Sequence, residues 1–216
     1  MHWNYILFDL DGTLFDTSEG IIHSLRSALE QCGEKCESDS EMYKFIGPPL
    51  IIALKEFYGM SAEKAERVKD VFRVFYREKG VFECKPIAGA EKCLRVLSEA
   101  GRTLAVATSK PDAFAKQILE RHGFTRYFAA ICGAESDAQK KSDVVRNALT
   151  ALSLCEGAKN CVMVGDRKYD VEGAAACGIP CIGLKTGFAE EGEFARAGAI
   201  AVAEDYERLT QMLLLD

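Results

Sequence analysis

The sequence predicts an α/β protein with a doubly wound parallel sheet and an inserted small α-helical cap domain. From residue 81 onward, short apolar segments alternate with helical segments, and the connections between them are short. Residues 17–80 contain only helical patterns, and they interrupt this alternation directly after the first apolar segment. Because alternating strands and helices build parallel sheets covered by helices on both faces, this order indicates a core with an insertion.

The core domain is expected to be Rossmann-like and to comprise residues 1–16 and 81–216. Its strands are predicted from short apolar runs at residues 5–10, 103–108, 128–133, 161–166, 180–184 and 199–203. Its helices are predicted from apolar residues at helical spacing, at residues 89–100, 111–122, 141–153, 170–177 and 205–214. In such sheets, ligands bind at the carboxyl ends of the strands.

The inserted cap domain is expected to comprise residues 17–80. Residues 18–32 carry apolar residues at a helical period, and Ser18 is suited to cap the start of that helix. The other predicted helices of the cap span residues 40–46, 49–58 and 61–79. Gly47 and Pro48 break the helical pattern between two of them and predict a loop there.

Composition and charge exclude several classes of function. Hydrophobic residues make up 48% of the chain and charged residues 28%, which is typical of a globular protein with a sizeable core. The net charge of -6 argues against nucleic acid as a partner. No apolar run approaches the roughly 18 residues that a membrane span needs. The N-terminal segment lacks the features of a signal peptide, so we expect a cytoplasmic protein. A monomer or weak homodimer is expected, because a monomer needs no special sequence feature.

Four carboxylates are expected to meet at one edge of the sheet. Asp9 and Asp11 follow the first predicted strand, Asp166 ends another, and Asp170 comes four residues later. Four carboxylates in one cleft cannot all be ionised without compensation, and Mg²⁺ is the hard cation that takes oxygen ligands. The sequence therefore predicts a Mg²⁺ cofactor at this edge.

Hydroxyl and ammonium groups are expected at the same edge. Thr108 ends the strand at 103–108 and Ser109 follows it, while Lys140 and Lys141 stand at the start of the predicted helix at 141–153. A cation, a lysine and a hydroxyl together suit a phosphate dianion. Gly12 would allow the backbone to approach that phosphate closely. The predicted ligand is therefore a small phosphorylated metabolite.

The two acids after the first strand can divide the chemistry of phosphate transfer between them. An ionised aspartate such as Asp9 can attack phosphorus and form an aspartyl-phosphate. A second carboxyl, Asp11, can protonate the leaving oxygen and then activate water, provided that its pKa is raised.

Each candidate also has a purely structural alternative. An Asp-x-Asp-Gly segment is often a turn or a helix cap. Thr108 can cap the next helix, and Lys141 can be a solvated lysine at a helix start. Asp166 and Asp170 can cap the helix predicted at 170–177. The functional interpretation is favoured because all these groups occur together at strand ends, in this order.

The segments ILFDLDGTLFD, VATSKP, the lysine ahead of SDVV, and VMVGDRKYDVEGA resemble the four motifs of the haloacid dehalogenase superfamily. They span almost the whole chain in the expected order. The resemblance implies that Asp9 is the nucleophile and a Mg²⁺ ligand. It also implies that Asp11 is the general acid and base and offers its backbone carbonyl to the metal.

The resemblance assigns the remaining residues to phosphate and metal binding. Thr108 would donate a hydrogen bond to the phosphoryl group. Lys141 would neutralise both the nucleophile and the phosphate, and by its register Lys140 is the weaker choice for this role. Asp166 would complete the metal shell, and Asp170 would support it directly or through its neighbours.

The position of the insertion is similar to the helical cap of phosphoglycolate phosphatase and bacterial 5′-nucleotidase-type members. The segment FIGPPL at 45–50 looks like their cap loop, so Gly47 and Pro48 are expected to shape the leaving-group pocket. A simple turn between cap helices is the alternative. Phosphoglycolate, a nucleoside monophosphate and a sugar phosphate all remain open as substrates.

Three functions are compatible with these residues to different degrees. The leading one is a Mg²⁺-dependent phosphatase for a small phosphomonoester. A sugar phosphomutase on the same scaffold would use the same residues. A receiver-type signalling domain also gathers acids, a hydroxyl and a lysine at strand ends, but it is much shorter and has no helical insertion.

Overall fold

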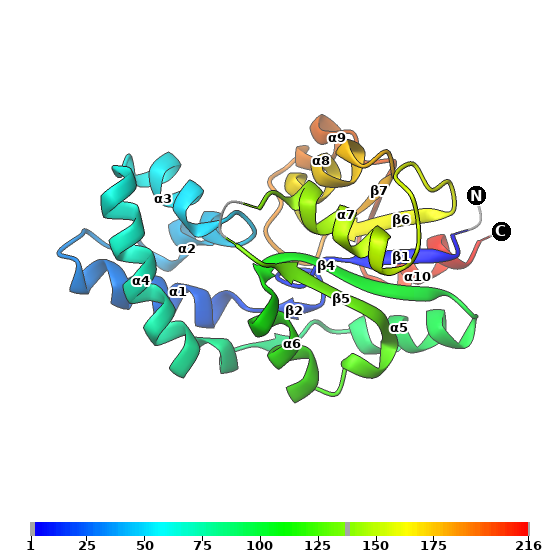
Figure 1. The fold of residues 1–216 in the computed structure, drawn as a ribbon, viewed down its shortest axis with the longest axis horizontal. Coiled ribbons are helices and arrows are strands. Elements are labelled where there is room, and N and C mark those ends of the chain that lie inside the picture. Colours follow the sequence, from blue (N-terminus) through cyan, green and yellow to red (C-terminus); the bar gives the residue numbers. More distant parts are fainter. Residues whose placement is uncertain (1–2, 137–138, 216) are drawn as a thin grey trace.

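A six-stranded parallel sheet forms the centre of the protein in a computed structural model that describes residues 3–136 and 139–215 (Figure 1). The strand order is β5-β4-β1-β6-β7-β8. The strands are β1 (Tyr5–Phe8), β4 (Thr103–Pro111), β5 (Phe128–Ala134), β6 (Cys161–Gly165), β7 (Cys181–Leu184) and β8 (Ala201–Ala203). The predicted fold class is confirmed.

The central strand β1 is apolar on both faces because helices cover both sides of the sheet. Ile6 and Phe8 pack into one hydrophobic cluster, together with residues of helices α5 (Ala90–Glu99), α6 (Asp112–Arg121) and α10 (Tyr206–Leu214). Leu7 points to the opposite face and packs into a second cluster, with residues of helices α7 (Lys141–Ala151), α8 (Lys168–Ala176) and α9 (Glu193–Ala197). This alternation fixes the register of β1 between β4 and β6.

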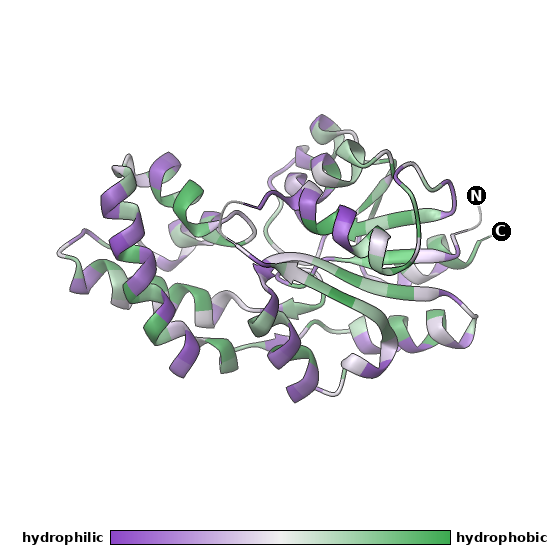
Figure 2. Cartoon of the chain, viewed as in Figure 1, coloured by the Kyte–Doolittle hydropathy of each residue, from purple (hydrophilic) through white to green (hydrophobic). Residues whose placement is uncertain are grey.

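The helices of the predicted cap form a separate block beyond the sheet, at the left of Figure 1. They are α1 (Ser18–Gln31), α2 (Asp39–Met42), α3 (Leu50–Tyr58) and α4 (Ala62–Glu78), with short 3₁₀ helices η1 (Tyr43–Phe45) and η2 (Gly80–Phe82). Leu25, Leu54 and Val68 belong to a hydrophobic cluster that lies within this block. Figure 2 shows long hydrophilic stretches on α4, whereas the central strands are mainly hydrophobic. On this basis we propose the predicted domains, with a cap at residues 17–80 and a core at residues 1–16 and 81–216.

Two short strands join the helical block to the core. They are β2 (Phe15–Asp16) and β3 (Lys85–Pro86), which pair in antiparallel fashion. Both crossings of the chain between core and cap therefore lie side by side. The sequence analysis did not predict this ribbon, because two-residue strands carry no periodic pattern.

Two local predictions were wrong in detail, and one helix was missed. Thr17, and not Ser18, occupies the N-cap position of α1, because the Asp16 carboxylate accepts the Ser18 backbone N–H at 3.1 Å. Helix α8 begins at Lys168, two residues before the predicted start at Asp170. Helix α9 was not predicted.

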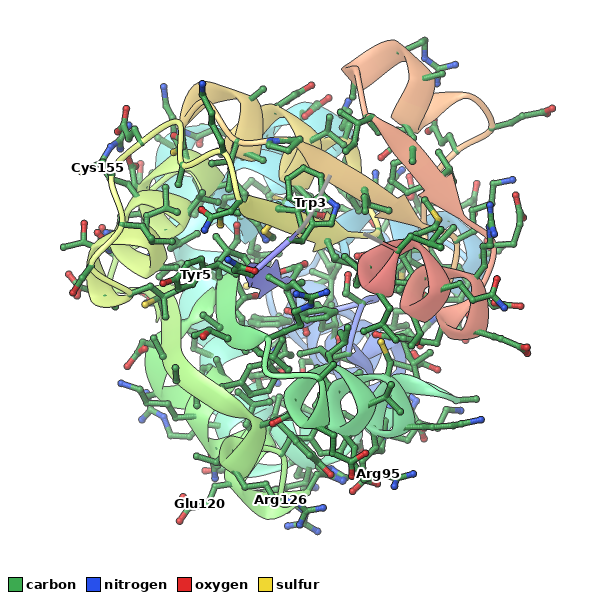
Figure 3. The ribbon with its side chains drawn as sticks, turned by 90° about the vertical axis from the view of Figure 1, so that its right-hand side faces the viewer. Trp3, Tyr5, Arg95, Glu120, Arg126 and Cys155 are labelled. Atoms are coloured by element: carbon green, nitrogen blue, oxygen red, sulfur yellow. The ribbon has the colours of Figure 1, made fainter. Side chains whose placement is uncertain are left out.

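The edge of the sheet opposite the helical block carries the amino end of β1. Figure 3 looks onto this side, where Trp3 and Tyr5 lie near the centre of the view. Trp3 is buried in the first hydrophobic cluster. The labelled Arg95, Glu120 and Cys155 lie at the periphery. The predicted polar site lies at the other end of the strands.

Candidate active site

The loop after β1 brings the first two acids to the carboxyl end of the sheet. The Asp9 backbone N–H donates to the Val164 carbonyl at 2.9 Å, so Asp9 continues the ladder with β6. Gly12 has a φ of 78°, and a Cβ there would lie 2.2 Å from the Asp166 Oδ2 atom. The turn therefore requires glycine, both for its backbone conformation and for the space beside this carboxylate.

Asp9, Asp166 and Asp170 converge at the carboxyl ends of β1 and β6. One carboxylate oxygen from each lies within 4.8 Å of the others, and all three side chains are buried. The Asp166 Oδ1 atom accepts the Thr13 hydroxyl at 3.0 Å. The Asp166 Oδ2 atom is buried and has no hydrogen-bond partner. An orphaned carboxylate oxygen inside an acidic cluster fits a site for a divalent cation.

Lys141 bridges two of these carboxylates. Its Nζ atom lies 2.6 Å from the Asp9 Oδ1 atom and 2.7 Å from the Asp170 Oδ1 atom. Lys141 reaches them because α7 and α8 approach closely at Gly173, where a Cβ would lie 2.6 Å from the Lys141 side chain. The neighbouring Lys140 is exposed, so the predicted register of the lysine agrees with the geometry.

The Asp170 carboxylate has two tasks. Its Oδ1 atom contacts Lys141, and its Oδ2 atom accepts the Arg167 backbone N–H at 3.1 Å at the start of α8. Asp170 therefore caps the start of α8, which was the structural alternative, and it also lies in the acidic cluster, as predicted.

Asp11 is held apart from this cluster by partners of its own. Its Oδ1 atom accepts the Lys110 ammonium at 2.8 Å and the Thr17 hydroxyl at 2.6 Å. Lys110 also lies over the ring of Tyr76, 4.9 Å from its centroid. Burial by itself would lower the pKa of Lys110, but Asp11 raises it above its ordinary value, so the ammonium stays charged. Lys110 stands in the segment VATSKP of the second motif, but its contact with Asp11 was not predicted, nor was that of Thr17.

The carboxylates outnumber the ammonium groups at this edge. Among the described residues, the four aspartates form ion pairs with two ammonium groups, Lys110 and Lys141, which leaves an excess of two negative charges if all four are ionised. Burial raises the pKa of Asp9 to about 6, against the opposing effect of Lys141. Burial also raises the pKa of Asp166 well above its ordinary value, and Asp170 and Asp9 add to this. A divalent cation would balance the excess and keep the carboxylates ionised.

A cavity of about 160 Å³ lies between Asp11 and the helical block, and Asp9, Asp166 and Asp170 are not among its lining residues. Of the predicted site residues, Asp11, Ser109, Gly47 and Pro48 line it. Thr108 is 1% exposed, and its hydroxyl accepts the Lys110 backbone N–H at 3.2 Å.

Gly12 lies outside the described lining of this cavity. It lines a neighbouring groove, where its carbonyl accepts the Thr186 hydroxyl at 2.7 Å. The cavity therefore joins the predicted cap loop to two of the predicted core residues, Asp11 and Ser109.

One face of α4 forms much of the cavity wall. Lys69, Phe72, Arg73 and Tyr76 line it, and their spacing of three, four and seven residues places them on one side of the helix. None of these four residues was predicted as part of the site. The spacing was visible, but a helical stripe of this kind does not reveal whether it faces a cavity or a neighbouring helix.

Two further buried charges lie beside the acids. Arg167 follows Asp166 directly, and its guanidinium Nε atom lies 3.0 Å from the Glu193 carboxylate. The sequence analysis assigned neither of them a role. Arg167 stands inside the fourth motif, but its partner comes from a helix that was not predicted.

Comparisons with known proteins agree with this geometry. Residues 6–184 match the family model described as haloacid dehalogenase-like hydrolase. The chain is 37% identical over 210 residues to a 5′-nucleotidase of Pseudomonas aeruginosa, covering 96% of this chain and 94% of that one. It is 30% identical over 190 residues to a phosphoglycolate phosphatase of Agrobacterium fabrum, covering 85% and 81% of the two chains.

Two further relatives extend this comparison. The chain is 37% identical over 185 residues to the tyrosine-protein kinase PtkA of Mycobacterium tuberculosis, covering 85% of this chain and 62% of that protein. The crystal structure of a predicted phosphatase from Clostridium acetobutylicum matches with a TM-score of 0.94 at 39% identity, covering 99% of both chains. In the described part of the chain, no helix has the length and apolar character needed to cross a membrane. The chain belongs to the haloacid dehalogenase-like hydrolase family, in which it is an enzyme of the phosphatase type.

Proposed function

We propose that the protein is a Mg²⁺-dependent phosphatase that hydrolyses a small phosphomonoester through an aspartyl-phosphate intermediate. The observation that carries the proposal is the separation of Asp9 from Asp11. Asp9 lies in a cluster with Asp166, Asp170 and the Lys141 ammonium, whereas Asp11 is bound by a different lysine. Two carboxyl groups in such different surroundings can act as nucleophile and as general acid.

The acidic cluster supports the proposed cofactor. Asp9, Asp166 and Asp170 would hold Mg²⁺, because their excess charge and the orphaned oxygen of Asp166 fit a hard divalent cation. The ion would neutralise charge on the phosphoryl oxygens. The proposed contact of the Asp11 backbone carbonyl with the metal rests on the family resemblance.

Asp9 is suited to attack phosphorus. Its contact with Lys141 at 2.6 Å fixes the orientation of the carboxylate and favours its ionised form. Attack forms a bond from an Asp9 oxygen to phosphorus and breaks the bond from phosphorus to the leaving oxygen. Lys141 also offers positive charge to the transferred group, and Thr108, Ser109 and Gly12 are the proposed hydrogen-bonding partners of its oxygens.

Asp11 is suited to act first as the general acid and then as the general base. It lines the cavity in which the leaving group would sit, so a protonated Asp11 can donate to the leaving oxygen. In the second half of the reaction, the same carboxylate takes a proton from the water that attacks phosphorus, the bond from phosphorus to the Asp9 oxygen breaks, and inorganic phosphate leaves. Lys110 and Thr17 hold the carboxylate in place for both steps.

The cavity supports a small leaving group. The cavity has a volume of about 160 Å³, and the loop that contains Gly47 and Pro48 forms one of its walls. Phe72 and Tyr76 add aromatic surface, and Lys69 adds positive charge. These features suit phosphoglycolate or a nucleoside monophosphate as the substrate, and closure of the cap would exclude water during the first step. A cytoplasmic, monomeric or weakly dimeric enzyme stays the prediction.

A phosphate-release screen tests the proposal. The purified protein is assayed with Mg²⁺ on phosphoglycolate, nucleoside 5′-monophosphates and hexose phosphates, and kcat/KM is compared. We expect release of inorganic phosphate from at least one of them, and none after treatment with EDTA. Conversion of a hexose phosphate to an isomer without free phosphate would support the phosphomutase instead. Full activity in EDTA would contradict the metal dependence.

A further inference from the structure

Arg167 connects the core to the loop between η1 and α3. Its side chain is buried, and its Nη1 atom donates to the Ile46 carbonyl at 2.8 Å. Its Nε atom donates to the Glu193 Oε1 atom at 3.0 Å. One guanidinium therefore joins the helical block to α9 through two directed hydrogen bonds.

Glu193 is a fixed anchor for this arginine. Its carboxylate accepts the Lys168 backbone N–H at 2.6 Å and the Glu190 backbone N–H at 3.1 Å. Burial acts to raise the pKa of Glu193, but these N–H groups and Arg167 lower it below its usual range. The carboxylate is therefore ionised near neutral pH, and it leaves Arg167 little freedom to turn.

The loop that Arg167 contacts also forms a wall of the cavity. Gly47 and Pro48 line the cavity, and Ile46 is fully buried. Gly47 has a φ of 104°, and a Cβ there would lie 3.3 Å from the Arg167 Cγ atom. The loop is thus packed between the arginine and the space for the leaving group.

We propose that Arg167, anchored by Glu193, is a positioning residue that fastens the loop at residues 46–49 over the active site. Arg167 directly follows Asp166, so it ties the position of the cap loop to the strand end that carries the acidic cluster. The role in substrate binding rests on the proposed function, whereas the mechanical link does not.

Hydrogen–deuterium exchange tests the link without any need for activity. Arg167→Met removes both hydrogen bonds and keeps much of the side-chain volume. Arg196→Met is the matched control, because Arg196 lies one turn after Glu193 but is exposed, and its guanidinium donates to the exposed Glu191 carbonyl and not to the cap loop. We expect backbone exchange in peptides covering residues 43–50 to rise about tenfold in Arg167→Met, the value for a lost hydrogen bond to a charged group. The control should stay within about twofold of the wild type.

Steady-state kinetics test the positioning role. With phosphoglycolate, or with the best substrate of the phosphate-release screen, we expect KM to rise about tenfold in Arg167→Met. The value of kcat should stay within about threefold, because the acids that react are not removed. A fall in kcat with unchanged KM would show that Arg167 acts through Asp166 instead, and it would overturn the proposal.

A second variant keeps the test decisive if Arg167→Met does not fold. A lysine at this position can reach Glu193 or the Ile46 carbonyl, but it cannot serve both with the geometry of a guanidinium. Arg167→Lys should therefore accelerate exchange at residues 43–50 and leave α8 protected. Unchanged exchange at residues 43–50 in a folded variant refutes the link, whether or not the protein hydrolyses any phosphomonoester.

Discussion

Replacement of Lys141 by methionine should destabilise the protein strongly in the absence of metal. Lys141 is the cation that lies 2.6 Å from Asp9 and 2.7 Å from Asp170, and its side chain is only 7% exposed. Removal of one partner from a buried ion pair costs about 3–5 kcal/mol, because the remaining charges are left uncompensated. At about 2–4 °C per kcal/mol for a chain of this size, the unfolding midpoint should fall by roughly 10 °C.

The loss should depend on pH in a defined direction. An aspartate has an ordinary pKa of about 3.9, and burial raises that of Asp9 to about 6 in the folded protein. A carboxyl pKa that is raised by folding lowers stability as the pH increases between these two values. Without the Lys141 ammonium the pKa of Asp9 rises further, so the difference from the wild type should be larger at about pH 8 than at about pH 5.

Thermal and urea unfolding, followed by circular dichroism in EDTA at both pH values, measure this difference. Lys140→Met is the matched control, because this neighbouring lysine is exposed, and we expect a change within about 0.5 kcal/mol. Equal stability of Lys141→Met and the wild type at about pH 8 would refute the reasoning that Lys141 compensates buried, ionised carboxylates.

Three other predictions follow from the same contacts. Gly12→Ala should inactivate the enzyme, because the new methyl group would lie 2.2 Å from the Asp166 carboxylate. Gly101→Ala is the control, since its methyl group meets no atom within 4 Å and it should lose only the roughly 1–3 kcal/mol of stability that a left-handed backbone costs. Activity and unfolding assays compare the two variants. Lys110→Met should lower kcat about 100-fold for an alkyl phosphate, because Asp11 loses the ammonium group that holds its carboxyl in place for proton transfer. The loss should be smaller for p-nitrophenyl phosphate, whose leaving group needs no proton, and equal losses would contradict the role of Asp11 as an acid. Mg²⁺ at 100 times its dissociation constant should raise the free energy of unfolding by about 2.7 kcal/mol, and with it the unfolding temperature. Calorimetry that finds no shift of the unfolding temperature would exclude the metal site.

The acidic cluster could be predicted from the sequence because its members are placed by local rules. Asp9 and Asp166 stand at the ends of apolar runs, and parallel strands bring their carboxyl ends to one edge of a sheet. Lys141 begins a helix whose apolar period is clear. No knowledge of distant packing was needed for these three residues.

Other parts of the site depend on contacts between distant residues. Lys110 meets Asp11 across 99 positions of the chain, and Arg167 meets the Ile46 carbonyl across 121. A single sequence has no pattern that pairs such residues, because the pairing follows from how the cap settles on the core. The short strands β2 and β3 escaped prediction for a related reason, since only their mutual pairing makes them strands.

The central claim is that Asp9 becomes phosphorylated during turnover. Rapid acid quenching of the enzyme with excess phosphomonoester and Mg²⁺, followed by mass spectrometry, measures this directly. We predict one phosphoryl group on the peptide that contains Asp9, released by hydroxylamine, and a folded but inactive Asp9→Asn variant that carries none. Turnover by Asp9→Asn at the wild-type rate, or a phosphoryl group on a different residue, would contradict the account.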